Sequence, residues 1–580
     1  MNRVCADELV FVPLGGAGEI GMNLNLYGYG PADDPTWMMV DLGVTFSDGR
    51  VPGVDVIMPD PAFIVERCNR LAGLVLTHAH EDHLGAVPYL WPQFRCPIYA
   101  TPFTVSILRR KLAEKGLEDH AEIIEVPLGG RFDVGPFALE LITLTHSIPE
   151  PNAIAIRTPA GTVLHTGDWK FDPDPVVGPA SDEQALRRLG DDGVLAIVCD
   201  STNVFLPGES GSESELLKSL TGLIGDCENR VAVTCFATNV ARLETIARAA
   251  RANGRDVVLA GRSLRRIDAA ARENGYLSDT PAFLDEDDAG NLPKNKAVII
   301  CTGSQGEPRA ALSRIADNDH PHGRLEGGDM VIFSSRIIPG NETLISNLHN
   351  RLVRRGIDIV TERNHLVHVS GHPARDELAR MYQYVRPKIA IPVHGELRHM
   401  IEHANLARDC QVNQVVVVEN GSLVRLGPGG PGIVDHLPSG RMALSGNRVV
   451  AFDGELIRGR NRAIWNGSVV ATVGIKASGE LAFKPQITTT GLVDADDDPA
   501  LSNAVNAIGE TLRALQFVAS LLTSILATRT SSPTNVLRPS NSEHNHARND
   551  VYVTRRCGLA GRSRSRGCAG EDHWWRRVQR

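Results

Sequence analysis

Short apolar runs that end in polar residues recur along the first 400 positions of the chain. The clearest runs are residues 73–76, 139–144, 161–164, 194–199 and 390–393. Continuous apolar runs of this length, bounded by polar or glycine positions, are typical of strands that are buried on both faces. The pattern therefore predicts a set of buried strands, each of which presents polar side chains just beyond its end.

The first run is followed by a dense cluster of candidate metal ligands. The chain reads His-x-His-x-Asp-His over residues 78–83, and the candidate ligands there are His78, His80, Asp82 and His83. Imidazole and carboxylate groups are ligand types that Zn²⁺ accepts. Because polar groups are costly to bury beside a strand unless a cation pairs with them, the cluster predicts a metal site.

Three later runs each deliver one more candidate ligand. His146, Asp168 and His394 stand just after the runs at 139–144, 161–164 and 390–393. Together with the first cluster they exceed what one tetrahedral ion takes, so the sequence favours two metals.

Two further polar features allow more than one interpretation. Gly16, Gly18 and Gly21 match a dinucleotide-binding pattern, but residues 23–28 alternate like a strand where that pattern requires a helix, so we predict a glycine-rich hairpin. Asp41 ends the apolar run at 37–40. It is either a partner that orients a histidine ligand or a turn-forming residue before Gly43.

From about residue 206 the pattern changes to strands alternating with helices. A helix rich in Ala and Arg is predicted at 239–253, and strands at 257–260, 297–301 and 330–333. This alternation indicates an inserted α/β domain with a parallel sheet. A Gly/Pro run at 427–432 suggests a boundary, and alternating segments after residue 450 suggest a small mixed domain.

Composition adds three constraints. The 580 residues are 42% hydrophobic with a net charge of −9, so no global basic field indicates nucleic acid, although a local basic groove remains compatible with it. The 10 cysteines are scattered and several lie in apolar runs, which fits reduced core residues. The N-terminus lacks a signal pattern, and the uncharged run at 514–528 is too short for a bilayer. We therefore expect a cytoplasmic protein without membrane contact.

The ordered motifs carry a family resemblance. The ligand pattern resembles the metallo-β-lactamase superfamily, and the long insert followed by a second histidine group resembles its β-CASP branch. More closely, the chain is similar to the bacterial ribonuclease J family over residues 8–425, through the motifs at 15–21, 146–150, 200–203, 302–308, 338–342, 368–372 and 392–396.

The resemblance implies an α/β fold: a metallo-β-lactamase αββα sandwich with an inserted β-CASP domain and a small C-terminal α+β domain. The expected domains are 1–205 and 366–428 for the sandwich, 206–365 for the insert, 429–450 for a linker, 451–529 for the C-terminal domain and 530–580 for a disordered tail rich in Ser, Asn and Arg.

The resemblance also implies roles for individual residues. One Zn²⁺ would be held by His78, His80 and His146, a second by Asp82, His83 and His394, and Asp168 would bridge them. Asp200 and His372 would handle protons, and the substrate phosphate would bind at His368, Val369, Ser370, Gly371 and His372.

The implied activity is a zinc-dependent ribonuclease, both 5′→3′ exonuclease and endonuclease, that matures and degrades RNA through a hydroxide shared by two metals. The expected substrate is single-stranded RNA with a 5′-monophosphate, and a homodimer or homotetramer is expected if the C-terminal domain is intact. The alternatives are a small-molecule binuclear zinc hydrolase, which explains the ligands but not the insert, and a non-catalytic RNA-binding subunit, which does not explain a complete ligand set.

Overall fold

The computed structural model describes residues 7–47, 51, 53–338, 340–476, 478, 480–493 and 498–529. It divides into two compact units, one ending at Phe452 and the other beginning at Asp453. The first unit contains every candidate site residue. Each unit is described separately below.

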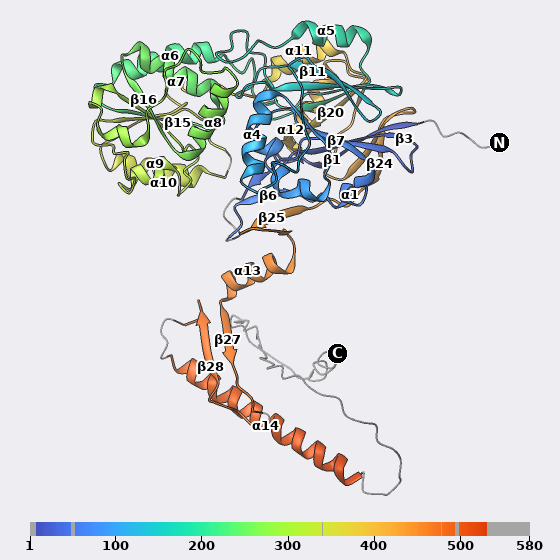
Figure 1. Ribbon diagram of the computed structural model, residues 1–580, viewed down its shortest axis with the longest axis vertical. Coiled ribbons are helices and arrows are strands. Elements are labelled where there is room, and N and C mark those ends of the chain that lie inside the picture. The colour runs from blue at the N-terminus through green and yellow to red at the C-terminus, as the bar shows by residue number, and fades with distance from the viewer. Residues whose placement is uncertain are drawn as a thin grey trace, which may run out of the picture. The chain divides into compact units, whose positions relative to one another are not determined.

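Two facing β-sheets form the centre of the first unit (Figure 1). The first sheet has the order β24 (Gly432–His436), β23 (Ser422–Gly427), β1 (Glu8–Gly15), β3 (Leu24–Gly30), β4 (Thr36–Val40), β7 (Leu71–Val75), β8 (Ile98–Ala100) and β9 (Ile123–Glu125). The second has the order β10 (Arg131–Val134), β11 (Phe137–Thr143), β12 (Asn152–Thr158), β13 (Gly161–His165), β14 (Ala196–Asp200), β20 (Ile389–Val393) and β22 (Gln414–Val415).

The two sheets pack through apolar side chains that alternate along their strands. Phe11 and Tyr27 of the first sheet belong to the same buried cluster as Leu139, Ile154 and Ile391 of the second. The opposite face of the first sheet is covered by α4 (Pro102–Ala113), and that of the second by α5 (Glu183–Asp192), α11 (Arg375–Val385) and α12 (Leu397–Asp409). Because both faces are buried near the centre of each sheet, central strands such as β4 and β20 are apolar along most of their length. The αββα arrangement predicted from the sequence is confirmed.

The inserted domain has its own parallel sheet, with the order β16 (Asp256–Ala260), β17 (Ala297–Cys301), β15 (Val231–Thr234), β18 (Met330–Phe333) and β19 (Asp358–Val360). Figure 1 shows α6 (Glu213–Asp226), α7 (Val240–Ala252) and α8 (Arg262–Glu273) on one side of these strands, and α9 (Ala311–Ala316) and α10 (Glu342–Val353) on the other. The side chain of Asn239 caps α7 by accepting a hydrogen bond from the Arg242 amide at 2.8 Å.

The glycine-rich segment at 15–21 is a turn between strands and opens no helix. β1 and β3 are antiparallel neighbours, and the short β2 (Ala17–Gly18) between them pairs with β21 (Gly395–Glu396). Gly16, Gly18 and Gly21 all have positive φ, a conformation that glycine adopts without steric cost. This pairing brings the segment beside His394, and it agrees with the predicted hairpin.

The prediction of a linker at 429–450 is wrong. β24 pairs with β23, and β25 (Arg441–Ser445) pairs both with β26 (Arg448–Ala451) and with β6 (Val56–Pro59). The Gly/Pro run at 427–432 is therefore the turn between two antiparallel strands, and the chain after it continues to build the first unit.

The second unit contains α13 (Glu455–Asn466), a hairpin of β27 (Ser468–Thr472) and β28 (Gln486–Thr490), and α14 (Pro499–Arg529). The predicted tail at 530–580 lies outside the described residues. No helix in the described ranges combines the length and apolar character needed to cross a membrane.

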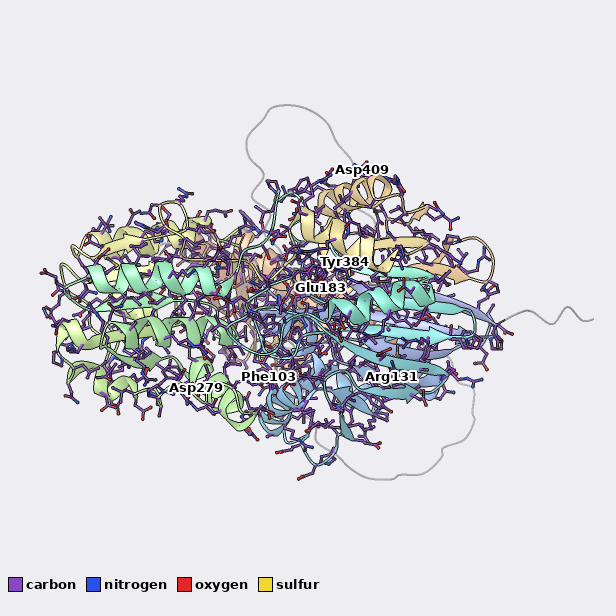
Figure 2. The ribbon with its side chains drawn as sticks, turned by 90° about the horizontal axis from the view of Figure 1, so that it is seen from above. Phe103, Arg131, Glu183, Asp279, Tyr384 and Asp409 are labelled. Atoms are coloured by element: carbon purple, nitrogen blue, oxygen red, sulfur yellow. The ribbon has the colours of Figure 1, made fainter. Side chains whose placement is uncertain are left out.

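Helix α4 and a buried carboxylate connect the sandwich to the inserted domain. Figure 2 shows Phe103 of α4 where the two domains meet, and its ring lies 6.1 Å from that of Tyr276 in the insert. Glu377 of α11, which is fully buried, accepts hydrogen bonds from the Phe171 amide at 2.7 Å, the Ser210 amide at 2.8 Å and the Ala374 amide at 2.9 Å. This one side chain ties together the segments by which the chain enters and leaves the insert.

We predict that Glu377→Ala lowers the stability of the first unit by about 3 kcal/mol, because it leaves several buried amides without an acceptor. Thermal unfolding followed by circular dichroism measures the effect. Glu362→Ala, which changes an exposed glutamate, is the matched control. Equal unfolding temperatures for the two variants would contradict the role assigned to Glu377.

Candidate metal centre

The candidate ligands meet because several strands end at the same edge. β11 and β13 run in the same direction on either side of β12, and β14 and β20 run parallel to β13. Their carboxyl ends therefore share one edge, where His146, Asp168, Asp200 and His394 follow. The facing sheet contributes residues 78–83, which follow β7 and lead into the short helix α2 (Glu81–Leu84).

Three groups of candidate ligand atoms form at this edge, each with all its atoms within 4.8 Å of one another; two of them share Asp168, and the third consists of Asp200, His372 and His394. The first group is His78, His80, His146 and Asp168, and the second is Asp82, His83, Asp168 and His394. All seven residues predicted as metal ligands are thus brought together, and Asp168 belongs to both groups. Whether each of them ligates a metal stays a prediction.

The nitrogens that face one another in the first group carry too few protons to hydrogen-bond with each other. His146 Nδ1 donates to the carbonyl oxygen of Gly371 at 2.5 Å, so its Nε2 carries a lone pair. His78 Nδ1 donates to Thr77 Oγ1 at 3.0 Å, because that hydroxyl donates its own proton to Asp41 at 2.9 Å. The Nε2 atoms of His78 and His146 then both face His80 Nδ1, at 3.1 and 3.0 Å. A single proton on that atom cannot serve both.

Burial keeps these imidazoles neutral. It lowers the pKa of His78 and of His146 well below the ordinary value, and it lowers the pKa of His80 to about 4. Neutral imidazole is the form that ligates a metal. The three converging nitrogens therefore fit a cation better than they fit one another.

The second group places carboxylates against imidazole nitrogens. His83 Nδ1 donates to Asp41 Oδ2 at 2.7 Å, and its Nε2 lies 3.2 Å from Asp168 Oδ2. His394 Nδ1 donates to Asn23 Oδ1 at 3.0 Å, and its Nε2 lies 3.5 Å from the same Asp168 oxygen. Within the described part of the chain, His394 Nε2 and Asp168 Oδ1 are buried and have no hydrogen-bond partner.

The charges of this group attract a cation. Burial lowers the pKa of His83, but the carboxylates of Asp168, Asp82 and Asp41 outweigh burial and raise it well above the ordinary value. The His83 ring therefore favours its protonated, positively charged form, with Asp41 at Nδ1 and Asp168 at Nε2. A divalent cation would satisfy the same oxygens together with the orphaned nitrogen of His394. The donor set fits a metal centre.

Asp41 has both of the roles that its sequence position allowed. It has a positive φ of 63°, as a turn residue often has, and its carboxylate also accepts from the Thr77 amide at 2.8 Å and from His83. It therefore fixes the orientation of a candidate ligand from behind.

The two residues predicted to handle protons lie beside the ligands. His372 Nδ1 donates to Asp200 Oδ2 at 2.8 Å, and Asp200 Oδ1 accepts from the amide and hydroxyl of Thr202 at 2.8 and 2.7 Å. Burial lowers the pKa of His372, but the charges of Asp200 and Asp168 outweigh burial and raise it to about 9. The ring of His372 stacks on that of His394, with centroids 5.6 Å apart.

The predicted phosphate-binding segment runs from the inserted domain to the ligands. At one end, His368 lies beside the buried Arg242, and the carbonyl of Val369 accepts from Arg242 at 3.4 Å. At the other end, Gly371 packs so closely on His146 that a Cβ would lie 2.6 Å from that ring. Between them, Ser370 Oγ accepts from Asn203 Nδ2 at 2.7 Å. The structure thus places all five predicted residues in one strip, with Gly371 and His372 nearest the ligands.

Sequence reasoning missed several residues that support this geometry: Asn23, Thr77, Asn203 and Arg242. Key partners of these residues lie far away in the sequence: Asp41 is 36 positions from Thr77, and His394 is 371 positions from Asn23. Only Asn203 carried a signal, because it ends the quoted motif at 200–203.

Three family models match consecutive parts of the chain. They are a beta-lactamase superfamily domain at residues 51–183, the beta-CASP domain of Ribonuclease J at 228–352, and a Zn-dependent metallo-hydrolase RNA specificity domain at 356–418. The last of these spans the predicted phosphate-binding segment and His394.

Curated relatives cover most of the chain. It is 45% identical to Ribonuclease J of Sinorhizobium meliloti over 85% of this chain and 87% of that protein. It is 39% identical to Ribonuclease J of Mycolicibacterium smegmatis over 87% of this chain and 89% of that protein, and 38% identical to Ribonuclease J of Corynebacterium glutamicum over 87% and 70%.

We predict that Asp41→Asn weakens Zn²⁺ binding by about 10–100-fold, because the amide no longer holds the His83 ring as a charged acceptor does. Competition titration with a chromogenic chelator measures the affinity. Asp435→Asn, which changes an exposed aspartate on β24, should bind Zn²⁺ as the unaltered protein does. An unchanged affinity in Asp41→Asn would show that the Asp41–His83 contact does not serve a metal.

Proposed function

Because this chain belongs to the ribonuclease J family of metal-dependent ribonucleases, we propose that it hydrolyses RNA with two zinc ions, as a 5′→3′ exonuclease and as an endonuclease. We further propose that it acts in RNA maturation and decay in the cytoplasm. Three features support this proposal: the ligand groups, the Asp200–His372 pair and the segment at 368–372.

The observation that carries the two-metal proposal is the position of Asp168. Its Oδ2 lies 3.2 Å from His83 Nε2 and 3.9 Å from His146 Nε2, so one carboxylate reaches into both ligand groups. We assign His78, His80 and His146 to one zinc ion and Asp82, His83 and His394 to the other. When bound, the two ions would activate a water molecule as the nucleophile and neutralise charge on the scissile phosphate.

We assign proton transfer to His372. Its Nδ1 is engaged by Asp200, so Nε2 is the atom left to donate a proton to the departing 3′ oxygen. Asp200 is itself held by Thr202 and therefore keeps the ring in one orientation. The raised pKa of His372 favours the protonated form that such an acid requires.

We assign substrate binding to the strip from His368 to His372. The side chains of His368 and Ser370 and the backbone at Gly371 would contact a phosphate, and the absence of a side chain at Gly371 lets that backbone come close. Since the strip runs from the insert to the ligands, a single RNA strand would lie between the two domains. Such backbone contacts weaken as salt rises. A 5′-monophosphate is the end that we propose the strip accepts.

We also propose that the protein assembles as a homodimer or homotetramer through its C-terminal unit. The hairpin of β27 and β28 and the long α14 are the described elements that offer surface for it. Size-exclusion chromatography with light scattering measures the assembly directly.

We predict that His80→Ala and Asp168→Ala each reduce the rate of RNA cleavage roughly a thousandfold, because they remove charge stabilisation at the reacting phosphate. Chelation should abolish cleavage by the unaltered protein, and Zn²⁺ should restore it. Asp409→Ala is the matched control, and Figure 2 shows Asp409 at the surface near the end of α12. The same preparations should leave a thioester and a β-lactam intact. Full turnover by Asp168→Ala would refute the assignment of the ligands.

A second prediction concerns the direction of cleavage. During a time course on RNA labelled at its 5′ end, a 5′-monophosphate substrate should release labelled mononucleotide from the earliest points. The same RNA with a 5′-triphosphate should give only longer labelled 5′ fragments from endonucleolytic cleavage, because we assign a single terminal phosphate to the strip from His368 to His372. Equal mononucleotide release from both would contradict recognition of the 5′ end.

A further inference from the structure

Arg336 is an arginine of the inserted domain that has no charged partner among the described residues. It follows the carboxyl end of β18, and its backbone is fixed because its carbonyl accepts from Gln305 Nε2 at 2.9 Å. Its side chain is exposed, and it forms no ion pair with any residue in the described ranges. Its polar side-chain contact is a hydrogen bond from Nη1 to Asn203 Oδ1 at 3.0 Å.

That contact joins Arg336 to the strip from His368 to His372. The amide group of Asn203 accepts from Arg336 with its oxygen and donates with its nitrogen to Ser370 Oγ at 2.7 Å and to the His372 carbonyl at 3.1 Å. One side chain of the sandwich therefore bridges the guanidinium and the strip. The guanidinium is thereby held beside the strip, and its other N–H groups donate to no residue in the described ranges.

Two other cations near the strip are already neutralised. The buried Lys170 lies 3.0 Å from Asp172, and the buried Arg242 lies 2.9 Å from Glu213. Burial and the positive charges of Arg242, Arg336 and Lys170 lower the pKa of His368 well below its ordinary value. Of these three, Arg336 alone among the described contacts keeps an uncompensated charge.

We propose that Arg336 binds a phosphate of the RNA strand beside the strip from His368 to His372, an inference that rests on the proposed function. A guanidinium offers several N–H donors in one plane, and a phosphate accepts two of them at once. One donor fixed on Asn203 sets the orientation of the plane, so the others are directed before the RNA arrives. The phosphate is either the terminal 5′-monophosphate or an internal phosphodiester.

The test is steady-state cleavage of a short single-stranded RNA that carries either a 5′-monophosphate or a 5′-hydroxyl. Arg336→Gln should raise KM about tenfold with little change in kcat, because it removes a charged contact to substrate and leaves the ligands in place. Arg336→Lys should retain part of the affinity, since it keeps the charge but not the planar donors. An increase in KM for the 5′-monophosphate RNA alone identifies the terminal phosphate. An equal increase for both RNAs identifies an internal phosphodiester.

Salt dependence separates direct contact from a structural effect. Loss of one phosphate contact should reduce the slope of log KM against log salt by about 0.7 for a single strand. Arg354→Gln is the matched control. Arg354 is exposed and precedes β19, whose first residue pairs with Met330, the first residue of β18. It therefore lies near the amino ends of these strands, whereas Arg336 follows the carboxyl end of β18. Arg354→Gln should leave both KM and the slope unchanged.

The inference fails if Arg336→Gln and Arg354→Gln give the same KM and the same salt slope. It also fails if Arg336→Gln lowers kcat and leaves KM unchanged, which would indicate a role in positioning the ligands. Failure of the proposed function is a separate result, because the unaltered protein loaded with Zn²⁺ would then leave both RNAs intact.

Discussion

Buried charge compensation around Asp168 holds the functional edge of this protein together. The carboxylate lies among imidazoles from both sheets, and burial alone would raise its pKa, but neighbouring His394 and His83 outweigh burial and lower it well below the ordinary value. Lone pairs from His78 and His146 converge without enough protons to satisfy them. Such a cluster is costly without a cation, and a divalent ion in each group would remove the cost. The ends of the strands thus present a donor set that suits a metal, and this fit does not depend on substrate.

A second buried network joins this edge to the inserted domain. Arg242 and Glu213 form an ion pair inside the protein, and Arg242 also donates to the Ser334 carbonyl at 2.7 Å and to the Val369 carbonyl at 3.4 Å. Breaking one partner of a buried pair leaves an uncompensated charge, so the arrangement has few alternatives. It fixes where the chain leaves the insert. Gly371 then meets His146, which links the position of the insert to the orientation of a candidate ligand.

Residues that carry their own chemistry were predictable, and residues that act through a distant partner were not. His78 to His83 are close in sequence, and their residue types alone indicate a metal. Asp41 could be assigned two roles but not its partner, because pairing with His83 depends on β4 lying beside β7. The sequence suggests a linker at 429–450 because glycine and proline mark turns and boundaries alike. Pairing of β25 with β6, across several hundred positions, decides between them.

The sequence by itself determined the buried strands, the α/β insert and the identity of the candidate ligands, because apolar periodicity and side-chain chemistry are local properties, whereas the αββα class was implied by the family resemblance. The grouping of the ligands about Asp168 was implied by the family resemblance, and only the tertiary structure decided that Asn23 orients His394 and that Asn203 bridges Arg336 to Ser370. Those facts depend on strand order and on contacts between distant segments. No local pattern encodes such contacts, because each follows from packing two sheets and an inserted domain against one another.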